Sequence, residues 1–484
     1  MSVSNFGPTT ILAILPEISL LVLAIVILIV DLVFKNAKKS FLGWLTALGL
    51  TVALVVTLIF SQPTGSEDLV MGGMLRHDWP AFSFNVVLMF AAAITAILSV
   101  GIPELSDRGE YFALLVVTTL GMNLMAASAD LMMLFLAIET TSIPLYILAG
   151  FMKNDDKSAE SGLKYFLFGA LTSAVMLYGF SLLYGLAGDT NIYRLAETTR
   201  LGEFSPWLLG GTAMLVLVGF AFKISAAPFH FWSPDVYEGA PTPITAFIST
   251  ASKAAGFAVL LRFMLAVFPM IEVEWTWILA IVATLTMTIG NVLALVQTNI
   301  KRLLAYSSIA HAGYALIGLV ALSELGTASV VFYLATYILT NLVAFAVVIV
   351  FARAAGSEEL EDYAGLSRRA PYLSLALLIA MLSLGGMPPL VGFVAKFYVF
   401  AAAVQSGWIW LAFVGVLNAI IGLYYYLTVL KVVYLYRSEE DDKSVPVPNS
   451  YAFVLVLCSV AIILIGTLSA PWFDWALNAA QSLF

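Results

Sequence analysis

Apolar segments long enough to cross a lipid bilayer follow one another along the whole chain. Hydrophobic residues make up 61% of the 484 positions and charged residues 11%, whereas a soluble domain has about half and about a quarter. A helix needs about 20 apolar residues to span the bilayer, and runs of this length predict about fourteen spans, from residues 11–34 to residues 451–468. We therefore expect an all-α polytopic membrane protein surrounded by the lipid bilayer.

The basic residues fall on alternate loops, which tests the span count independently of hydropathy. With Met1 placed outside, fifteen of the 22 Lys and Arg residues lie in cytoplasmic loops or helix ends, and four lie within spans. Only Arg76, Arg194 and Arg200 face the opposite side. Because cytoplasmic loops collect Lys and Arg, the pattern predicts an even number of spans, both termini outside, and a place in the inner (plasma) membrane of a cell.

Two successive blocks of five spans must have opposite orientations in the membrane, which is the inverted-repeat arrangement of many transporters. The fourth span of each block contains a helix breaker: residues 207–227 run into Pro228, and residues 372–403 include Gly-Gly-Met-Pro-Pro at 385–389. Proline removes a backbone donor and clashes with the preceding turn, so we expect two discontinuous helices. The predicted divisions are an N-terminal three-helix region, a first repeat, a second repeat, and a C-terminal helix with an interfacial tail, at residues 1–110, 111–268, 269–436 and 437–484.

Four ionisable residues lie inside these apolar spans: Glu139, Lys223, Lys253 and Lys396. A charge at the bilayer centre costs roughly 2.5–3.5 kcal/mol on insertion scales, so such residues mark ion or proton pathways by default. A carboxylate opposite a lysine exchanges protonation states as their distance changes, and we expect Glu139 and Lys223 to act in this way. The alternative is a static ion pair that holds two helices together.

Lys253, Lys396 and His311 are further candidates for proton transfer. Lys253 follows a polar patch at residues 249–252 that could hold water, although its amine could instead bond carbonyls freed by the neighbouring break. Lys396 follows the second break by about two helical turns, and the alternative for it is a side chain that snorkels to the interface. His311 could bridge the two repeats, because imidazole donates and accepts protons near neutral pH, or serve only as a hydrogen-bonding group. Other charged residues, most of them near span ends, are expected to be interfacial or structural: Glu17, Asp31, Asp130, Lys164 and Arg262.

Several kinds of site are excluded by the residues that the chain lacks. Cys458 is its only cysteine, which excludes multi-cysteine zinc and iron–sulfur sites. The three histidines, His77, His230 and His311, are far apart in sequence and form no H-E-x-x-H motif. No basic patch suggests nucleic-acid binding. We therefore expect no metal and no cofactor on this chain.

One long segment is specific enough to suggest a family. Residues 221–246, AFKISAAPFHFWSPDVYEGAPTPITA, resemble the antiporter-like membrane subunits of respiratory complex I, an NADH-quinone oxidoreductase, and residues 163–170, 306–314 and 385–397 share this likeness. With the span layout, the resemblance covers nearly the whole chain. It implies two inverted five-helix bundles, each a half-channel, with a Glu139–Lys223 ion pair, Lys253 as the connecting residue and Lys396 as the lysine on the exit side.

The resemblance implies a proton-translocating subunit of a multi-subunit, quinone-reducing complex. Its partners would be the other membrane subunits, and the redox energy would be released elsewhere in the complex, so that this chain would bind no nicotinamide, flavin or cluster. Two alternatives stay open. One is a subunit of a stand-alone multi-subunit sodium/proton antiporter, which has similar core helices. The other is a structural membrane scaffold, whose buried charges would be replaceable by apolar residues of similar volume.

Overall fold

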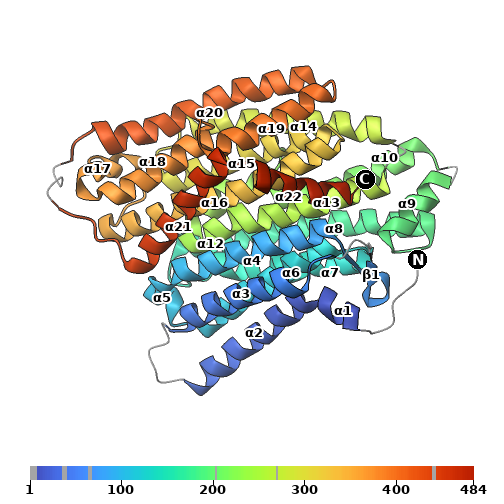
Figure 1. Ribbon diagram of the computed structural model, residues 1–484, viewed down its shortest axis with the longest axis horizontal. Coiled ribbons are helices and arrows are strands. Elements are labelled where there is room, and N and C mark those ends of the chain that lie inside the picture. Colours follow the sequence, from blue (N-terminus) through green and yellow to red (C-terminus); the bar gives the residue numbers. More distant parts are fainter. Residues whose placement is uncertain are drawn as a thin grey trace.

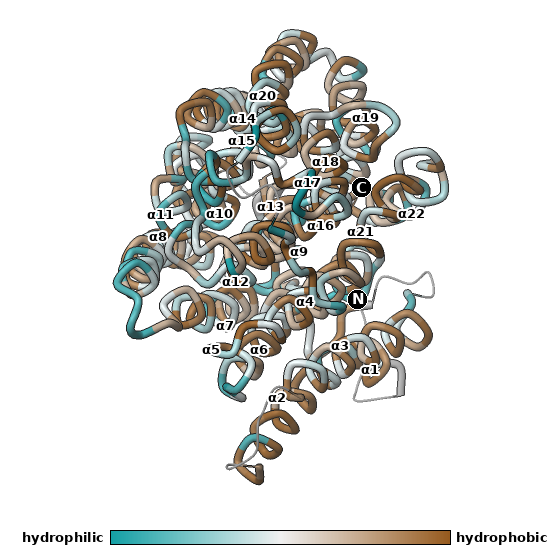
Figure 2. Tube along the Cα trace, turned by 90° about the vertical axis from the view of Figure 1, so that its left-hand side faces the viewer, coloured by the Kyte–Doolittle hydropathy of each residue, from teal (hydrophilic) through white to brown (hydrophobic). Residues whose placement is uncertain are grey.

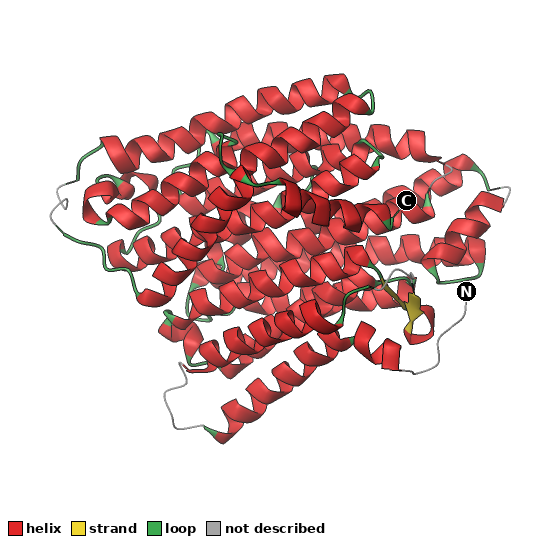
Figure 3. Ribbon diagram, in the orientation of Figure 1, coloured by secondary structure: helices red, strands yellow, loops and turns green. Residues whose placement is uncertain are grey.

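Long helices lying side by side make up almost all of the computed structural model (Figures 1 and 3). The structure describes residues 8–34, 41–63, 68–201, 204–268, 271–438 and 443–483. Within these ranges, the two strands form one antiparallel hairpin, β1 (Asp68–Val70) with β2 (Leu75–His77). Helices dominate because a backbone inside the bilayer has no water to bond and must pair its own polar groups.

Among the described residues, thirteen helices are long and apolar enough to cross a membrane, if α12 to α13 are taken together, and the shorter α18 and α19 supply one more span in two pieces. The predicted all-α fold of about fourteen spans is therefore confirmed. The helices are α1 (Pro8–Ala13), α2 (Leu15–Val33), α3 (Phe41–Phe60), α4 (Trp79–Val100), α5 (Pro103–Ser106), α6 (Gly109–Ala127), α7 (Leu131–Ala149), α8 (Asp156–Ala187), α9 (Ile192–Leu201), α10 (Pro206–Ile224), α11 (Trp232–Gly239), α12 (Thr242–Phe247), the π-helix η2 (Ile248–Ser252), α13 (Lys253–Val267), α14 (Glu272–Ala294), α15 (Ile300–Val320), α16 (Glu324–Ala355), α17 (Leu366–Arg369), α18 (Pro371–Gly385), α19 (Val391–Gln405), α20 (Ile409–Leu435), α21 (Asn449–Thr467) and α22 (Ala470–Gln481), with short 3₁₀ turns η1 (Met71–Gly73) and η4 (Leu360–Tyr363).

The two repeats can be matched through their helix ends. α7 and α15 begin at side-chain N-caps, Asp130 and Asn299. Each cap forms an isolated bridge with a residue that follows the next long helix, Asn191 for the first and Glu359 for the second. Those long helices, α8 and α16, both have 32 residues and both end at a glycine with φ of 71°. The first cap lies beside the β-hairpin, where Ala129 N–H donates to the Met74 carbonyl, and the second lies at the other end of the bundle, so the repeats are inverted.

Both predicted helix breaks are present. α10 ends at Ile224 and is followed by Ser225 in the left-handed conformation (φ 59°) before α11 begins. α18 ends at Gly385 and is followed by Gly386 with φ of 85° before α19 begins. Each break therefore leaves two half-helices with free backbone groups inside the bundle, which is tolerated only where protein or a wet cavity surrounds them.

Hydrophobic residues, in brown, make up most of the helices, while many of the hydrophilic residues, in teal, lie at loops and helix ends (Figure 2). Exposed apolar residues lie on peripheral helices, for example Leu48 on α3 and Ile420 on α20, as expected for surfaces that face lipid. α22 packs lengthwise against α16 with Phe473 and Ala476 buried, and in Figure 1 it runs along the direction of the long helices.

Candidate functional site

Lys223 lies against the helix that carries Glu139. It occupies the last turn of α10, is 7% exposed, and donates a hydrogen bond of 2.9 Å from Nζ to Oγ of Ser142 on α7. Glu139 is one helical turn before Ser142, interacts electrostatically with Lys223, and has a buried Oε1 without a hydrogen-bond partner. In the described part of the chain these two charges make no ion pair within 4 Å, and the Lys223 amine instead binds Ser142, one turn along α7 from Glu139.

The close approach of α13 to Lys223 depends on one glycine. A Cβ at Gly256 would lie 3.2 Å from Cγ of Lys223 and 2.9 Å from a methyl group of Ile224. These distances leave no room for a side chain, so Gly256 allows the end of α10 to pack on α13. One turn before Gly256 on the same helix is Lys253, the next candidate.

Lys253 joins the two repeats. It begins α13 directly after the π-helix η2, is 2% exposed, and its Nζ donates to the backbone oxygen of Ser308 at 2.5 Å and to its Oγ at 2.6 Å. The carbonyl belongs to α15 and not to the helix break, unlike the alternative raised by the sequence. The Tyr237 hydroxyl of α11 lies 3.4 Å from the same Ser308 Oγ.

His311 lies one turn beyond Ser308 and is held between two tyrosines. The Tyr333 hydroxyl of α16 is 2.6 Å from Nδ1, and the Tyr426 hydroxyl of α20 is 3.1 Å from Nε2. The Tyr426 hydroxyl is also 2.5 Å from Oγ of Ser307. The ring is 5% exposed, so both nitrogens have partners in a buried site that joins three helices of the second repeat. Sequence alone did not indicate either tyrosine.

Lys396 lies inside the bundle and binds the backbone at the second helix break. It is 5% exposed, and its Nζ donates to the carbonyls of Leu384 at 2.7 Å and Gly385 at 3.3 Å. These carbonyls are the last of α18 and lack helical partners, and a cation at a helix C-terminus is favourable. The amine also lies 5.0 Å above the Tyr314 ring, so it stays inside the bundle and does not reach the interface.

A cavity lies between His311 and this break. It has room for about one water molecule, and His311, Tyr337, Ser383 and Leu384 are among the residues that line it. Since Leu384 also accepts a hydrogen bond from Lys396, the cavity lies beside both the imidazole and the backbone that binds the lysine. Water in that space would complete a hydrogen-bonded route.

The charged groups occupy different positions in the two repeats. Positions at equal distance from the N-caps of α7 and α15 correspond, which matches Glu139 with Ser308 and Ser142 with His311. Positions at equal distance from the positive-φ residues Ser225 and Gly386 also correspond, which matches Lys223 with Leu384 and Asp235 with Lys396. In each pair, the position that holds a charged or imidazole group in one repeat holds a residue of different chemistry in the other repeat. The two repeats therefore share a backbone but supply different functional groups.

A second network of charges lies at the basic end of the bundle. Asp235 on α11 pairs with Lys164 at 2.5 Å and with Arg302 at 2.8 Å. Glu238 on the same short helix pairs with Lys157 at 2.8 Å and with Arg302 at 2.9 Å. The network ties α8 and α15 together through α11. Lys164 is thus structural, in agreement with the expectation for it.

Of the other charged residues, Arg262 has a structural role, and Glu17 is a buried acid outside the sites described above. Arg262 donates to both carboxylate oxygens of Asp78 at 2.7 Å within the core, so it is a buried ion pair. Glu17 was expected to be interfacial or structural, and it is buried, with an exposed fraction of 8%. Within the described ranges, no three His, Cys, Asp or Glu side chains come together as metal ligands.

Residues 128–422 match the family described as NADH:quinone oxidoreductase/Mrp antiporter, TM. This segment includes both broken helices and all five candidate residues for proton transfer. The chain belongs to this family. Loop residues 235–243 and Lys396 resemble those of subunit N among the complex I subunits.

Relatives of this family member extend over its full length. The NADH-quinone oxidoreductase subunit N of Trichlorobacter lovleyi is 42% identical over 474 residues, which cover 97% of this chain and 96% of the relative, so the likeness to subunit N is confirmed. A chain of respiratory complex I from Thermus thermophilus superposes with a TM-score of 0.81 at 34% identity, covering 95% of this chain and 98% of that one. A chain of the Mrp complex from Dietzia sp. DQ12-45-1b superposes with a TM-score of 0.85 at 19% identity, covering 98% and 97%, and at this identity it shows the fold alone.

Proposed function

We propose that this chain is a proton-translocating membrane subunit of an NADH-quinone oxidoreductase complex. The observation that supports it most is the contact of Lys253 with Ser308, which joins the buried groups of one repeat to those of the other. Buried ionisable groups of this kind are costly and mark proton relays. The redox chemistry would take place in other subunits, and this chain would bind no nicotinamide, flavin or cluster of its own.

Proton movement would begin at the Glu139–Lys223 pair. In this structure the Lys223 amine rests on Ser142, one turn along α7 from Glu139, so a short rotation of the lysine side chain would exchange one partner for the other. When the Glu139 carboxylate is near, it favours the charged form of the Lys223 amine. When the amine is bonded only to Ser142, the charged form is less favoured. A shift of α7 or α10 driven by another subunit would therefore load or release a proton at Lys223.

The later steps would run through Lys253, His311 and Lys396. Water would carry a proton from Lys223 to Lys253, Ser308 would pass it along α15 to His311, and the cavity beyond His311 would lead it to Lys396. The charge pattern further supports an inner-membrane location with the basic end of the bundle in the cytoplasm and both termini outside.

The test replaces Lys223 or Lys396 by alanine in the assembled complex. Proton pumping per quinone reduced should fall in both variants, whereas Lys431→Ala, which removes an exposed lysine from α20, should leave pumping unchanged. Unchanged pumping in both buried-lysine variants would contradict the proposal.

Purification distinguishes the competing function. The description of the matched family names the Mrp antiporter beside the oxidoreductase, which makes a stand-alone sodium/proton antiporter the second candidate. Co-isolation of this chain with flavin- and iron–sulfur-containing subunits supports the oxidoreductase, and their absence from an intact, active complex favours the antiporter.

A further inference from the structure

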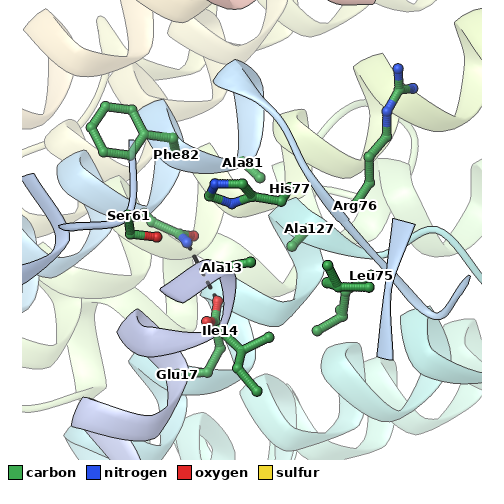
Figure 4. Close-up of a pocket in the computed structure, with 12 residues that line it drawn as sticks. Ala13, Ile14, Glu17, Ser61, Leu75, Arg76, His77, Ala81, Phe82 and Ala127 are labelled. Atoms are coloured by element: carbon green, nitrogen blue, oxygen red, sulfur yellow. Dashed lines mark hydrogen bonds between the residues drawn. The ribbon is translucent and has the colours of Figure 1, made fainter. Parts of the chain in front are cut away.

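One buried acid lies far from the proposed proton route. Glu17, near the start of α2, lines a small pocket beneath the β-hairpin together with Asn85 of α4 and His77 of β2 (Figure 4). Glu17 is 8% exposed and Asn85 is 5% exposed. The pocket has room for about one water molecule. Apart from Ala127 of α6, the residues that line it belong to the N-terminal three-helix region.

The hydrogen bonding of this acid is half complete. Nδ2 of Asn85 donates to Oε1 of Glu17 at 3.4 Å, the bond drawn as a dashed line in Figure 4. The second carboxylate oxygen, Oε2, and the amide oxygen of Asn85, Oδ1, are both buried without a partner. Two adjacent acceptors cannot satisfy each other, and leaving both unpaired costs about 1–3 kcal/mol for each group.

A single added proton gives both of these oxygen atoms a hydrogen-bond partner. If Oε2 carries hydrogen, it can donate to Oδ1 while Nδ2 continues to donate to Oε1, which closes a two-bond ring between a carboxylic acid and an amide. The proton comes from a water molecule in the form of hydronium, and the products are the neutral acid and water. We propose that Glu17 and Asn85 form a proton-holding site that exchanges with solvent at the hairpin end of the bundle.

The surroundings of the pair favour a proton over a metal cation. Besides Glu17, the titratable or charged groups that line the described pocket are Arg76 and His77, both on β2. Arg76 points away from Glu17 in Figure 4 and binds elsewhere, 3.3 Å from the Asp78 carboxylate and 4.5 Å from the Tyr193 ring centroid. His77 is half-buried and lines the same pocket as Glu17, so an imidazole that can donate and accept protons lies near the acid.

The site is tested with a hydrophobic carbodiimide, which reacts with protonated carboxyl groups in apolar surroundings. The purified complex is treated with dicyclohexylcarbodiimide over a pH series, and modification of Glu17 is measured by mass spectrometry. Labelling should be fast at low pH and should fall about tenfold for each pH unit once the group ionises. The exposed Glu104 on α5 is the comparison, because its carboxyl group is hydrated and lies outside an apolar site, so it should react little.

Variants separate a proton site from other roles. Glu17→Gln places an amide where the protonated acid stood and preserves both hydrogen bonds, so the complex should assemble normally with no label at this position. In deuterium exchange, an infrared C=O band of a protonated carboxylic acid should be present in the wild type and absent from Glu17→Gln. If neither label nor band is found, Glu17 is ionised and the proposal is wrong.

Protection of Glu17 from labelling by sodium chloride but not by choline chloride at constant pH would also overturn the proposal, because the site would then bind a metal cation. Since these measurements report on Glu17 alone, their failure would leave the proton route through the repeats unaffected.

Discussion

Replacing Tyr426 by phenylalanine removes one buried oxygen atom and tests whether His311 is part of the proton route. That hydroxyl contacts Nε2 of His311 at 3.1 Å and Oγ of Ser307 at 2.5 Å. Each hydrogen bond is worth about 0.5–1.5 kcal/mol net, so the substitution should destabilise the subunit by roughly 1–3 kcal/mol. If the bond to His311 also orients the ring during transfer, losing about 1 kcal/mol there slows proton transfer roughly fivefold.

The buried Tyr451 provides a control outside this cluster. Its hydroxyl donates to the Leu98 carbonyl oxygen at 2.8 Å, so the bond that is lost does not involve His311 or its partners. Tyr451→Phe should therefore cost a similar or smaller stability and leave transfer unchanged. Both variants are purified as complete complexes and reconstituted into liposomes, where proton uptake is followed with a pH-sensitive dye and divided by quinone reduced. Equal pumping by Tyr426→Phe and Tyr451→Phe would refute the role of His311.

Two further substitutions test the packing that holds the route in place. Arg262→Met should destabilise the subunit by about 3–5 kcal/mol, because it leaves the buried Asp78 carboxylate without its main partner, and thermal unfolding of the complex would measure this loss. Gly392→Ala should prevent α19 from packing on α18, since a Cβ there would lie 1.9 Å from the Ser383 carbonyl oxygen, whereas Gly210→Ala meets open space. Immunoblots of membranes should show little assembled complex for the first glycine variant and normal amounts for the second.

The number of spans and the positions of the helix breaks could be predicted from the sequence, because each depends on the residues of one short segment and not on its partners in the fold. A run of about 20 apolar residues forms a helix in lipid whatever its neighbours are, and Pro228 and Pro388 interrupt their helices through their own backbone chemistry. The same reasoning placed Lys253 and Lys396 inside the membrane, where the structure buries both. Their roles in proton transfer remain predictions.

The contacts of the site could not be predicted in the same way. The Tyr426 hydroxyl meets His311 across 115 positions of sequence, and tyrosine occurs in many spans without such a partner. Glu17 lies at the start of its span, where an acid is usually hydrated, and only the hairpin folded over it explains its burial. Likewise, the bond of Lys223 to Ser142 rather than to Glu139 depends on how far α10 extends before it breaks.

The most direct test of the central claim is the proton stoichiometry of Lys253→Met. Methionine has a similar volume and no charge, so it fills the site at the junction of the repeats and removes only the group that can carry a proton. We expect fewer protons moved per quinone reduced in liposomes containing the intact variant complex. An unchanged ratio would contradict a proton route through this subunit.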